Sequence, residues 1–182
     1  MILLSLFNLI PVWKYWTYKP PLQNTDTKRL EQKQQGQKIE PNMVFIDKLS
    51  IAAPIIYVEQ NSEAAFQEGL QKGVVHYPGT PQVGQSGNVY IFGHSSDFIY
   101  SSGKFKTVFT LLPKIQIGDL ITVSDKGGTP YIYKVIATKI VSPKDLSVLD
   151  QQNFQKKFLS LQTSYPIGTA LKRFVAVAEL LP

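Results

Sequence analysis

The stretch FLSLQTSYPIGTALKRFVAVAEL (residues 158–180) contains two apolar, strand-like runs separated by a turn with proline and glycine. Residues 158–163 and 171–180 are typical of β-strands, and residues 165–169 are typical of a turn. We therefore expect a hairpin, with Ser164 at the end of its first strand and Arg173 near the start of its second. In such a hairpin the two side chains meet at the mouth, which places a hydroxyl beside a fixed positive charge suited to an oxyanion.

Short β-type runs recur through the rest of the chain, with turn residues between them. They cover residues 43–47, 49–58, 74–75, 88–92, 119–123 and 131–139. An amphipathic segment at 62–71 predicts a short helix that stops at Gly73, and residues 105–112 predict a helical turn ended by Pro113. Seven or eight short strands with one or two brief helices predict a mainly β fold, a closed or nearly closed β-barrel.

The composition excludes several kinds of chemistry. The 182 residues suit one domain with a terminal extension, and 43% apolar residues are enough for a core. The absence of Cys excludes a disulfide framework, a zinc–cysteine site, an iron–sulfur cluster and thiol chemistry, and two His are too few for a multi-histidine metal centre. We expect no cofactor and no metal. The net charge of +6 is scattered and carries no nucleic-acid-binding signature, so we expect no nucleic-acid partner.

The N-terminal forty residues differ from the remainder. Residues 1–18 form an apolar, aromatic segment interrupted by Pro11 and Lys14, too short to span a bilayer that needs about 20 residues. It is either the downstream part of a truncated membrane anchor with interfacial aromatics, or an apolar arm packed on the domain. Residues 19–40 are rich in Gln, Lys and Pro and are typical of a linker. The folded domain is expected over residues 41–182.

His94 is the second candidate for chemistry. It follows the run VYIFG and begins a polar loop, Ser95-Ser96-Asp97. Loops on a rigid scaffold often carry functional groups, and a histidine there suits acid–base work. Taken alone, an isolated His is more often structural or simply exposed.

Three separated blocks, GVVHYPGTPQVGQSGNVYIFGH (73–94), IGDLITV (117–123) and LSLQTSYPIGTALKRFVAVAEL (159–180), together resemble the sortase family in order, spacing and strand context. The resemblance covers residues 41–181. It implies an eight-stranded sortase β-barrel around a cleft that binds the sorting signal of a surface protein. It also implies an extracytoplasmic transpeptidase at a bacterial membrane, which transfers the signal's acyl group to an amine of the cell wall or of a pilin. No C-terminal membrane span and no Asp-Pro-aromatic lid motif are visible, which favours a general anchoring role.

The resemblance also implies roles for particular residues. His94 and Arg173 match the family's catalytic His and Arg. Thr163 matches the Thr that precedes the nucleophile, and Ser160 takes the first Thr position of the same motif. His76 matches a His that is common in such sortases. We expect these three residues to support substrate binding. For His76 a turn residue packed behind the site is the preferred interpretation.

The nucleophile position, Cys in the family, is Ser164 here. A thiol with a pKa of about 8.5 ionises beside a cation, whereas an alkanol needs a well-oriented general base. Three explanations stay open: an enzyme disarmed by substitution, a natural relative that binds the signal without cleaving it, and a working serine hydrolase that uses His94. Asp97 is a candidate to orient His94, although a loop Asp is more often a turn former.

The connection over residues 141–157 corresponds to the loop that in sortases helps to form the signal-binding groove. Its Ser142, Pro143, Leu146, Val148 and Leu149 are candidates to contact a leucine-containing signal, with a plain surface loop as the alternative. Asp145 and Asp150 alone supply too few oxygen ligands for calcium. Asn88, Tyr90 and Phe92 are expected in the core or the barrel wall, and not as ligands.

Overall fold

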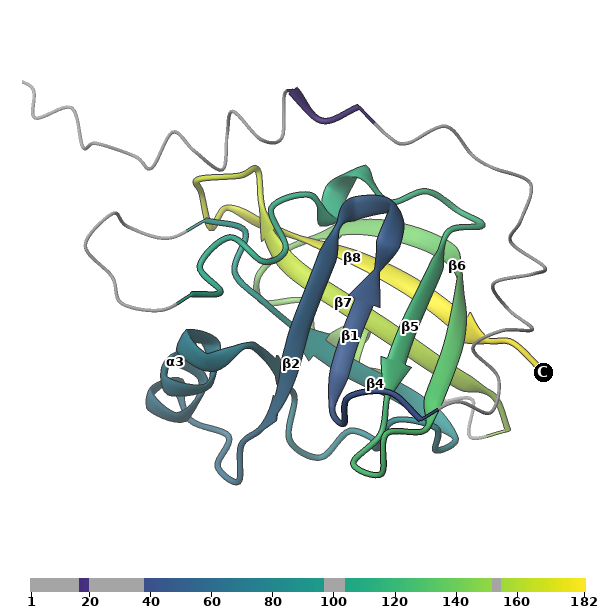
Figure 1. Ribbon diagram of the computed structural model, residues 1–182. Coiled ribbons are helices and arrows are strands. Elements are labelled where there is room, and N and C mark those ends of the chain that lie inside the picture. Colours follow the sequence, from purple (N-terminus) through teal and green to yellow (C-terminus); the bar gives the residue numbers. More distant parts are fainter. Residues whose placement is uncertain (1–16, 20–37, 97–103, 152–154) are drawn as a thin grey trace, which may run out of the picture.

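The computed structural model describes residues 17–19, 38–96, 104–151 and 155–182. Eight strands form a closed barrel in the order β1-β2-β3-β4-β7-β8-β6-β5 (Figure 1). The strands are β1 (Met43–Ile46), β2 (Ile51–Tyr57), β3 (Val74–His76), β4 (Gly87–Phe92), β5 (Leu120–Ser124), β6 (Pro130–Val141), β7 (Lys157–Tyr165) and β8 (Lys172–Leu180). The expected mainly β, closed eight-stranded barrel is confirmed.

The barrel closes around an aliphatic core. Successive side chains of a strand point alternately into and out of the barrel, so Val44 and Ile46 of β1 point inward and are fully buried. Leu159, Leu161 and Ala176 meet them from β7 and β8 within one buried cluster. Closure leaves no open sheet edge, and the barrel is therefore a rigid frame for the loops at its ends.

Helix α3 (Glu63–Lys72) lies outside the barrel and packs against β2 and β3 (Figure 1). Ser62 caps it, because its Oγ accepts a hydrogen bond from the N–H of Ala65. At the far end a Cβ on Gly73 would lie 2.2 Å from the carbonyl oxygen of Pro54, so only glycine permits this close approach to β2.

Two local predictions need correction. The run over 49–58 becomes a strand only from Ile51, because residues 47–49 form a 3₁₀ helix (Asp47–Leu49) followed by Ser50 in the left-handed region. Pro113 does not end the helical turn at 105–112. It lies inside the 3₁₀ helix Leu112–Lys114, where its missing N–H is not needed in the first turn.

The two strands of the predicted hairpin are nine residues each, and they pair antiparallel from Phe158↔Glu179 to Tyr165↔Lys172. β7 also pairs in parallel with β4, with Phe92 opposite Gln162. β7 is thus the central strand of a β4-β7-β8 sheet, and its C-terminal end lies beside the end of β4.

Candidate active site

Ser164 and Arg173 are paired across the β7–β8 ladder. Arg173 also pairs with Val141 of β6, so it lies between two strands. Its Nη1 donates to the carbonyl oxygens of Ala170 at 3.0 Å and Lys172 at 3.1 Å, which holds the guanidinium at the hairpin turn. Because a guanidinium carries five N–H donors, it can hold this turn and still bind an anion.

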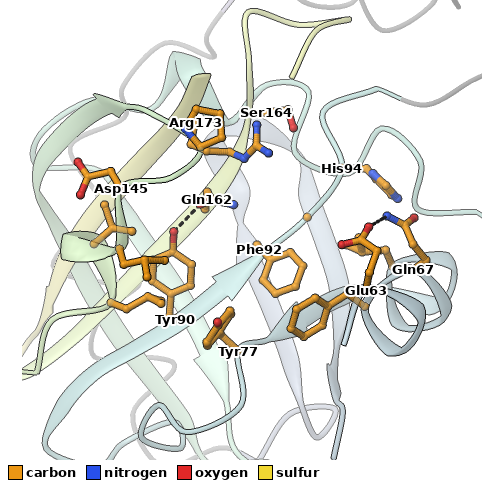
Figure 2. A pocket seen from close by; sticks show the side chains of 17 residues that line it. Glu63, Gln67, Tyr77, Tyr90, Phe92, His94, Asp145, Gln162, Ser164 and Arg173 are labelled. Carbon is orange, nitrogen blue, oxygen red and sulfur yellow. Dashed lines mark hydrogen bonds between the residues drawn. The ribbon is translucent and has the colours of Figure 1, made fainter. Parts of the chain in front are cut away.

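His94 follows β4 by two residues, and Ser164 follows Gln162 by two residues. Since Phe92 and Gln162 are partners in the parallel β4–β7 pair, His94 and Ser164 lie at the same level of the barrel. Ser164 and Arg173 lie next to each other along one rim of the cleft, and His94 lies further along that rim (Figure 2). The three residues expected to carry chemistry are therefore brought together.

The backbone around His94 is held by hydrogen bonds to neighbouring elements. The N–H of Gly93 donates to the carbonyl of Gln162 at 3.0 Å, and Thr163 Oγ1 donates to the carbonyl of Gly93 at 2.9 Å. The N–H of Gly168, in the β7–β8 turn, donates to Ser96 Oγ at 3.0 Å. The histidine loop and the hairpin that bears Ser164 are thus connected on both sides of His94.

The cleft has a volume of about 340 Å³ and two different walls. Glu63, Gln67 and Leu70 of α3 line one wall, and residues of the β6–β7 connection line the other (Figure 2). That second wall is largely apolar and consists of Pro143, Asp145, Leu146, Val148 and Leu149. The apolar wall suits an aliphatic side chain of a ligand.

The floor of the cleft is aromatic. Tyr90 is buried, and its hydroxyl donates to Gln162 Oε1 at 2.6 Å. Burial raises the pKa of Tyr90 well above its usual range, although the nearby Arg173 opposes this shift, so the phenol stays neutral. Phe66 packs edge-on against Phe92, with ring centroids 5.2 Å apart. Tyr90 and Phe92 belong to the barrel wall as expected, yet they also line the cleft.

Ser160 and Thr163 are buried and do not line the cleft. Ser160 Oγ donates to Asn88 Oδ1 at 2.9 Å, and Asn88 Nδ2 donates to the carbonyl of Val148 at 3.0 Å. This chain links β7 and β4 to the apolar wall. The hydroxyls of Ser160 and Thr163 therefore hold neighbouring parts of the chain in place around the cleft. Neither hydroxyl is placed to contact a ligand in the cleft.

His76 ends β3 and is 5% exposed, also away from the cleft lining. Its ring stacks on Tyr57 with centroids 4.7 Å apart, and its Nε2 lies 2.8 Å from the carbonyl oxygen of Pro81. Burial lowers the pKa of His76, and the Pro81 hydrogen bond only partly offsets this effect. His76 is thus a packed structural residue, as preferred from the sequence, but it ends strand β3 and is not a turn residue.

The loop prediction has a mixed outcome. Four of its five candidate residues line the cleft, and Ser142 does not. Asp97 lies outside the described residues. In the described part of the chain, no three His, Asp or Glu side chains gather closely enough to hold a metal ion.

The contribution of α3 was missed from the sequence. Glu63 and Gln67 are four residues apart and therefore share one helical face. Nothing in the local pattern indicates that this exposed face borders a cleft, because that depends on how the helix packs against β2 and β3.

A comparison with known protein families matches residues 44–181 to the sortase domain. The chain belongs to the sortase family. A curated relative of this sortase is sortase D of Bacillus subtilis (strain 168), 29% identical over 133 residues, which are 71% of this chain and 58% of that protein. The aligned region thus spans less than two thirds of the relative's length.

Solved sortase structures share the fold. A sortase D5 transpeptidase from Clostridium perfringens is 20% identical, with a TM-score of 0.63 and coverage of 88% of this chain and 91% of that one. Sortase C1 from Streptococcus agalactiae is 25% identical, with a TM-score of 0.63 and coverage of 93% and 83%. Across the described residues of this sortase, no helix has the length and apolar character needed to cross a membrane.

Proposed function

We propose that this sortase is a transpeptidase that cleaves an LPXTG-like C-terminal sorting signal and transfers the acyl group to an amine of the cell wall or of another protein. The observation that carries this proposal is the pairing of Ser164 with Arg173 on the cleft that His94 also lines. These positions correspond to nucleophile, electrostatic stabiliser and acid–base residue.

In the proposed reaction, the group at position 164 attacks the carbonyl carbon of the signal's Thr, which is bonded to the following Gly. Its proton passes to His94, and Arg173 binds the oxyanion that forms. The bond to the leaving glycine breaks, and His94 returns the proton to the departing amine. An acceptor amine then attacks the acyl carbon, the bond to residue 164 breaks, and the proton released by the amine passes through His94 to residue 164.

Ser164 decides whether this chain turns over. A thiolate forms readily beside a cationic His or Arg, whereas a serine hydroxyl stays protonated unless a base is well oriented. We therefore propose that Ser164 disarms the chain while leaving the cleft intact. A natural pseudoenzyme that binds the signal, or a serine hydrolase that uses His94 and Ser164, are the competing outcomes.

The chemistry of the two walls supports the choice of ligand. Leu146, Val148 and Leu149 present aliphatic side chains that suit the Leu and Pro of a signal, and Asn88 of β4 holds this wall through the carbonyl of Val148. Thr163, Ser160 and His76 support the site from behind. The proposal includes presentation outside the bacterial membrane, with the apolar segment over residues 1–18 as a tether; residues 1–16 lie outside the described part.

Incubation with an LPXTG-type peptide and a glycine-based acceptor tests the proposal. We expect product from the Ser164→Cys variant and little or none from the chain as it stands. Product from the unaltered chain, with labelling of Ser164 by a fluorophosphonate probe, would instead show a serine enzyme. Saturable peptide binding without product from either form would show a pseudoenzyme, and the absence of both would refute the proposal.

A further inference from the structure

The α3 wall of the cleft carries a carboxylate on the same side as His94. Glu63 and Gln67 both line the cleft, and Gln67 Nε2 donates to Glu63 Oε1 at 2.7 Å. Figure 2 shows Glu63, Gln67 and His94 on one side of the cleft and Asp145 on the other. The hydrogen bond holds the carboxylate on this wall, although both side chains are exposed.

The two carboxylates that line the cleft have different surroundings. Asp145 Oδ1 accepts from the N–H of Ser147 and caps the 3₁₀ helix Leu146–Leu149. Hydrogen bonding by the side chain of Ser147, and then by its backbone N–H, lowers the pKa of Asp145. Asp145 belongs to the wall that carries the aliphatic residues. Glu63 lies on the opposite wall, where its hydrogen-bond partner is the polar side chain of Gln67. The apolar wall therefore suits the signal, and the Glu63 wall suits a small cationic group.

We propose that Glu63, held by Gln67, binds the ammonium group of the incoming acceptor next to His94. This inference rests on the proposed function and adds the residue that selects the second substrate. The ammonium loses one proton to water, its nitrogen attacks the acyl carbon, and the bond to residue 164 breaks. The second proton then passes from nitrogen through His94 to the leaving oxygen or sulfur, so that atoms and charge balance.

The expected size of the effect follows from exposure. An exposed ion pair is worth at most about 1 kcal/mol, which corresponds to a factor of about five in affinity. Salt screens such a contact over about 10 Å at ordinary ionic strength. Loss of Glu63 should therefore raise the KM for a charged acceptor severalfold, and added salt should reduce the difference.

The test uses full-length protein in the Ser164→Cys background, with two acceptors at neutral pH. Triglycine carries an ammonium group, whereas hydroxylamine is mostly uncharged. We expect Glu63→Gln to raise the KM for triglycine about threefold to fivefold, to change that for hydroxylamine much less, and Glu63→Asp to recover part of the loss. Glu68→Gln is the matched control, because Glu68 lies on the same helix, is exposed, pairs with Lys72 and does not line the cleft.

An equal change in KM for both acceptors, or the same change in KM in Glu68→Gln, would overturn this inference and leave the proposed function standing. An unaltered KM for triglycine in Glu63→Gln would also overturn it. Failure of every form to make product with either acceptor would refute the proposed function, and the inference with it.

Discussion

Ser164 of β7 and Arg173 of β8 are direct Cα partners in an antiparallel ladder, and Arg173 is at the same time paired with Val141 of β6. The backbone of Arg173 is thus paired on both sides, one residue pair from the end of the hairpin, and its guanidinium donates to the carbonyls of Ala170 and Lys172. A charge placed in this way needs little reorganisation when an oxyanion forms beside it, which is the condition for strong electrostatic catalysis.

Removal of the Arg173 charge should therefore affect turnover far more than folding. In the Ser164→Cys background we expect Arg173→Ala to lower kcat/KM about 100-fold or more, as loss of one oxyanion donor does in other acyl-transfer enzymes. The kcat/KM of Arg173→Lys should lie between those of Arg173 and Arg173→Ala, because lysine retains the charge but lacks the planar guanidinium. Product formation from an LPXTG-type peptide measures this. Near-normal turnover of Arg173→Ala, with an unchanged Tm, would contradict the assigned role.

Thr163 should act on turnover through the backbone of Gly93. Thr163→Val keeps the shape but removes the donor to the Gly93 carbonyl, and the unpaired carbonyl should lower the free energy of unfolding by about 1–3 kcal/mol. Because Gly93 precedes His94, kcat should fall while the KM for the signal changes little. Thr163→Ser keeps the hydroxyl and should restore kcat. Urea unfolding and steady-state kinetics measure the two effects; a loss of stability with kcat intact would show a purely structural role.

Leu146 should contribute to binding of the signal. It is 69% exposed and lines the cleft, so Leu146→Ala should raise the KM or Kd for the peptide by about threefold to tenfold through lost apolar contact. Ile117 is 70% exposed and is not among the cleft residues, so Ile117→Ala is a matched control that should leave binding unchanged. Fluorescence anisotropy with a labelled signal peptide distinguishes them. Similar weakening in both variants would argue against a signal site on this wall.

His76 should make stability depend on pH. Its pKa lies below the ordinary value of 6.5, chiefly because of burial, so the unfolded chain takes up a proton that the folded chain resists. The free energy of unfolding should therefore fall as the pH drops below 6.5. His76→Gln removes this contribution, and its unfolding free energy should depend less on pH over that range. Urea titrations at several pH values measure the slope, and identical slopes in both proteins would refute the prediction.

Much of the β7–β8 hairpin and its chemistry is predictable from residues 158–180. Two strand-like runs and a Tyr-Pro-x-Gly turn indicate the hairpin, and the spacing of nine residues indicates that Ser164 and Arg173 meet at its mouth. These are local features, since turn residues and side-chain patterns act over a few positions along the chain. The same applies to the other strands and to the helix, whose ends were misplaced by one or two residues.

The meeting of His94 with that hairpin was expected only through the resemblance to sortases, because it depends on the parallel pairing of β4 with β7. The strand pattern of residues 88–92 does not predict which strand pairs with it. The same is true of Tyr90 and Phe92, whose positions on the barrel wall make them the floor of a cleft only when α3 and the β6–β7 connection stand on either side.

The amino-acid sequence by itself determined the strands, the hairpin and the types of chemical group available, because these follow from local backbone preference and composition. Only the tertiary structure decided that Glu63, Gln67 and His94 line the same cleft, and that Ser160 and Thr163 are buried and do not line it. The physical reason is that closing the barrel fixes the neighbours and register of every strand, and these long-range pairings set which side chains share one space.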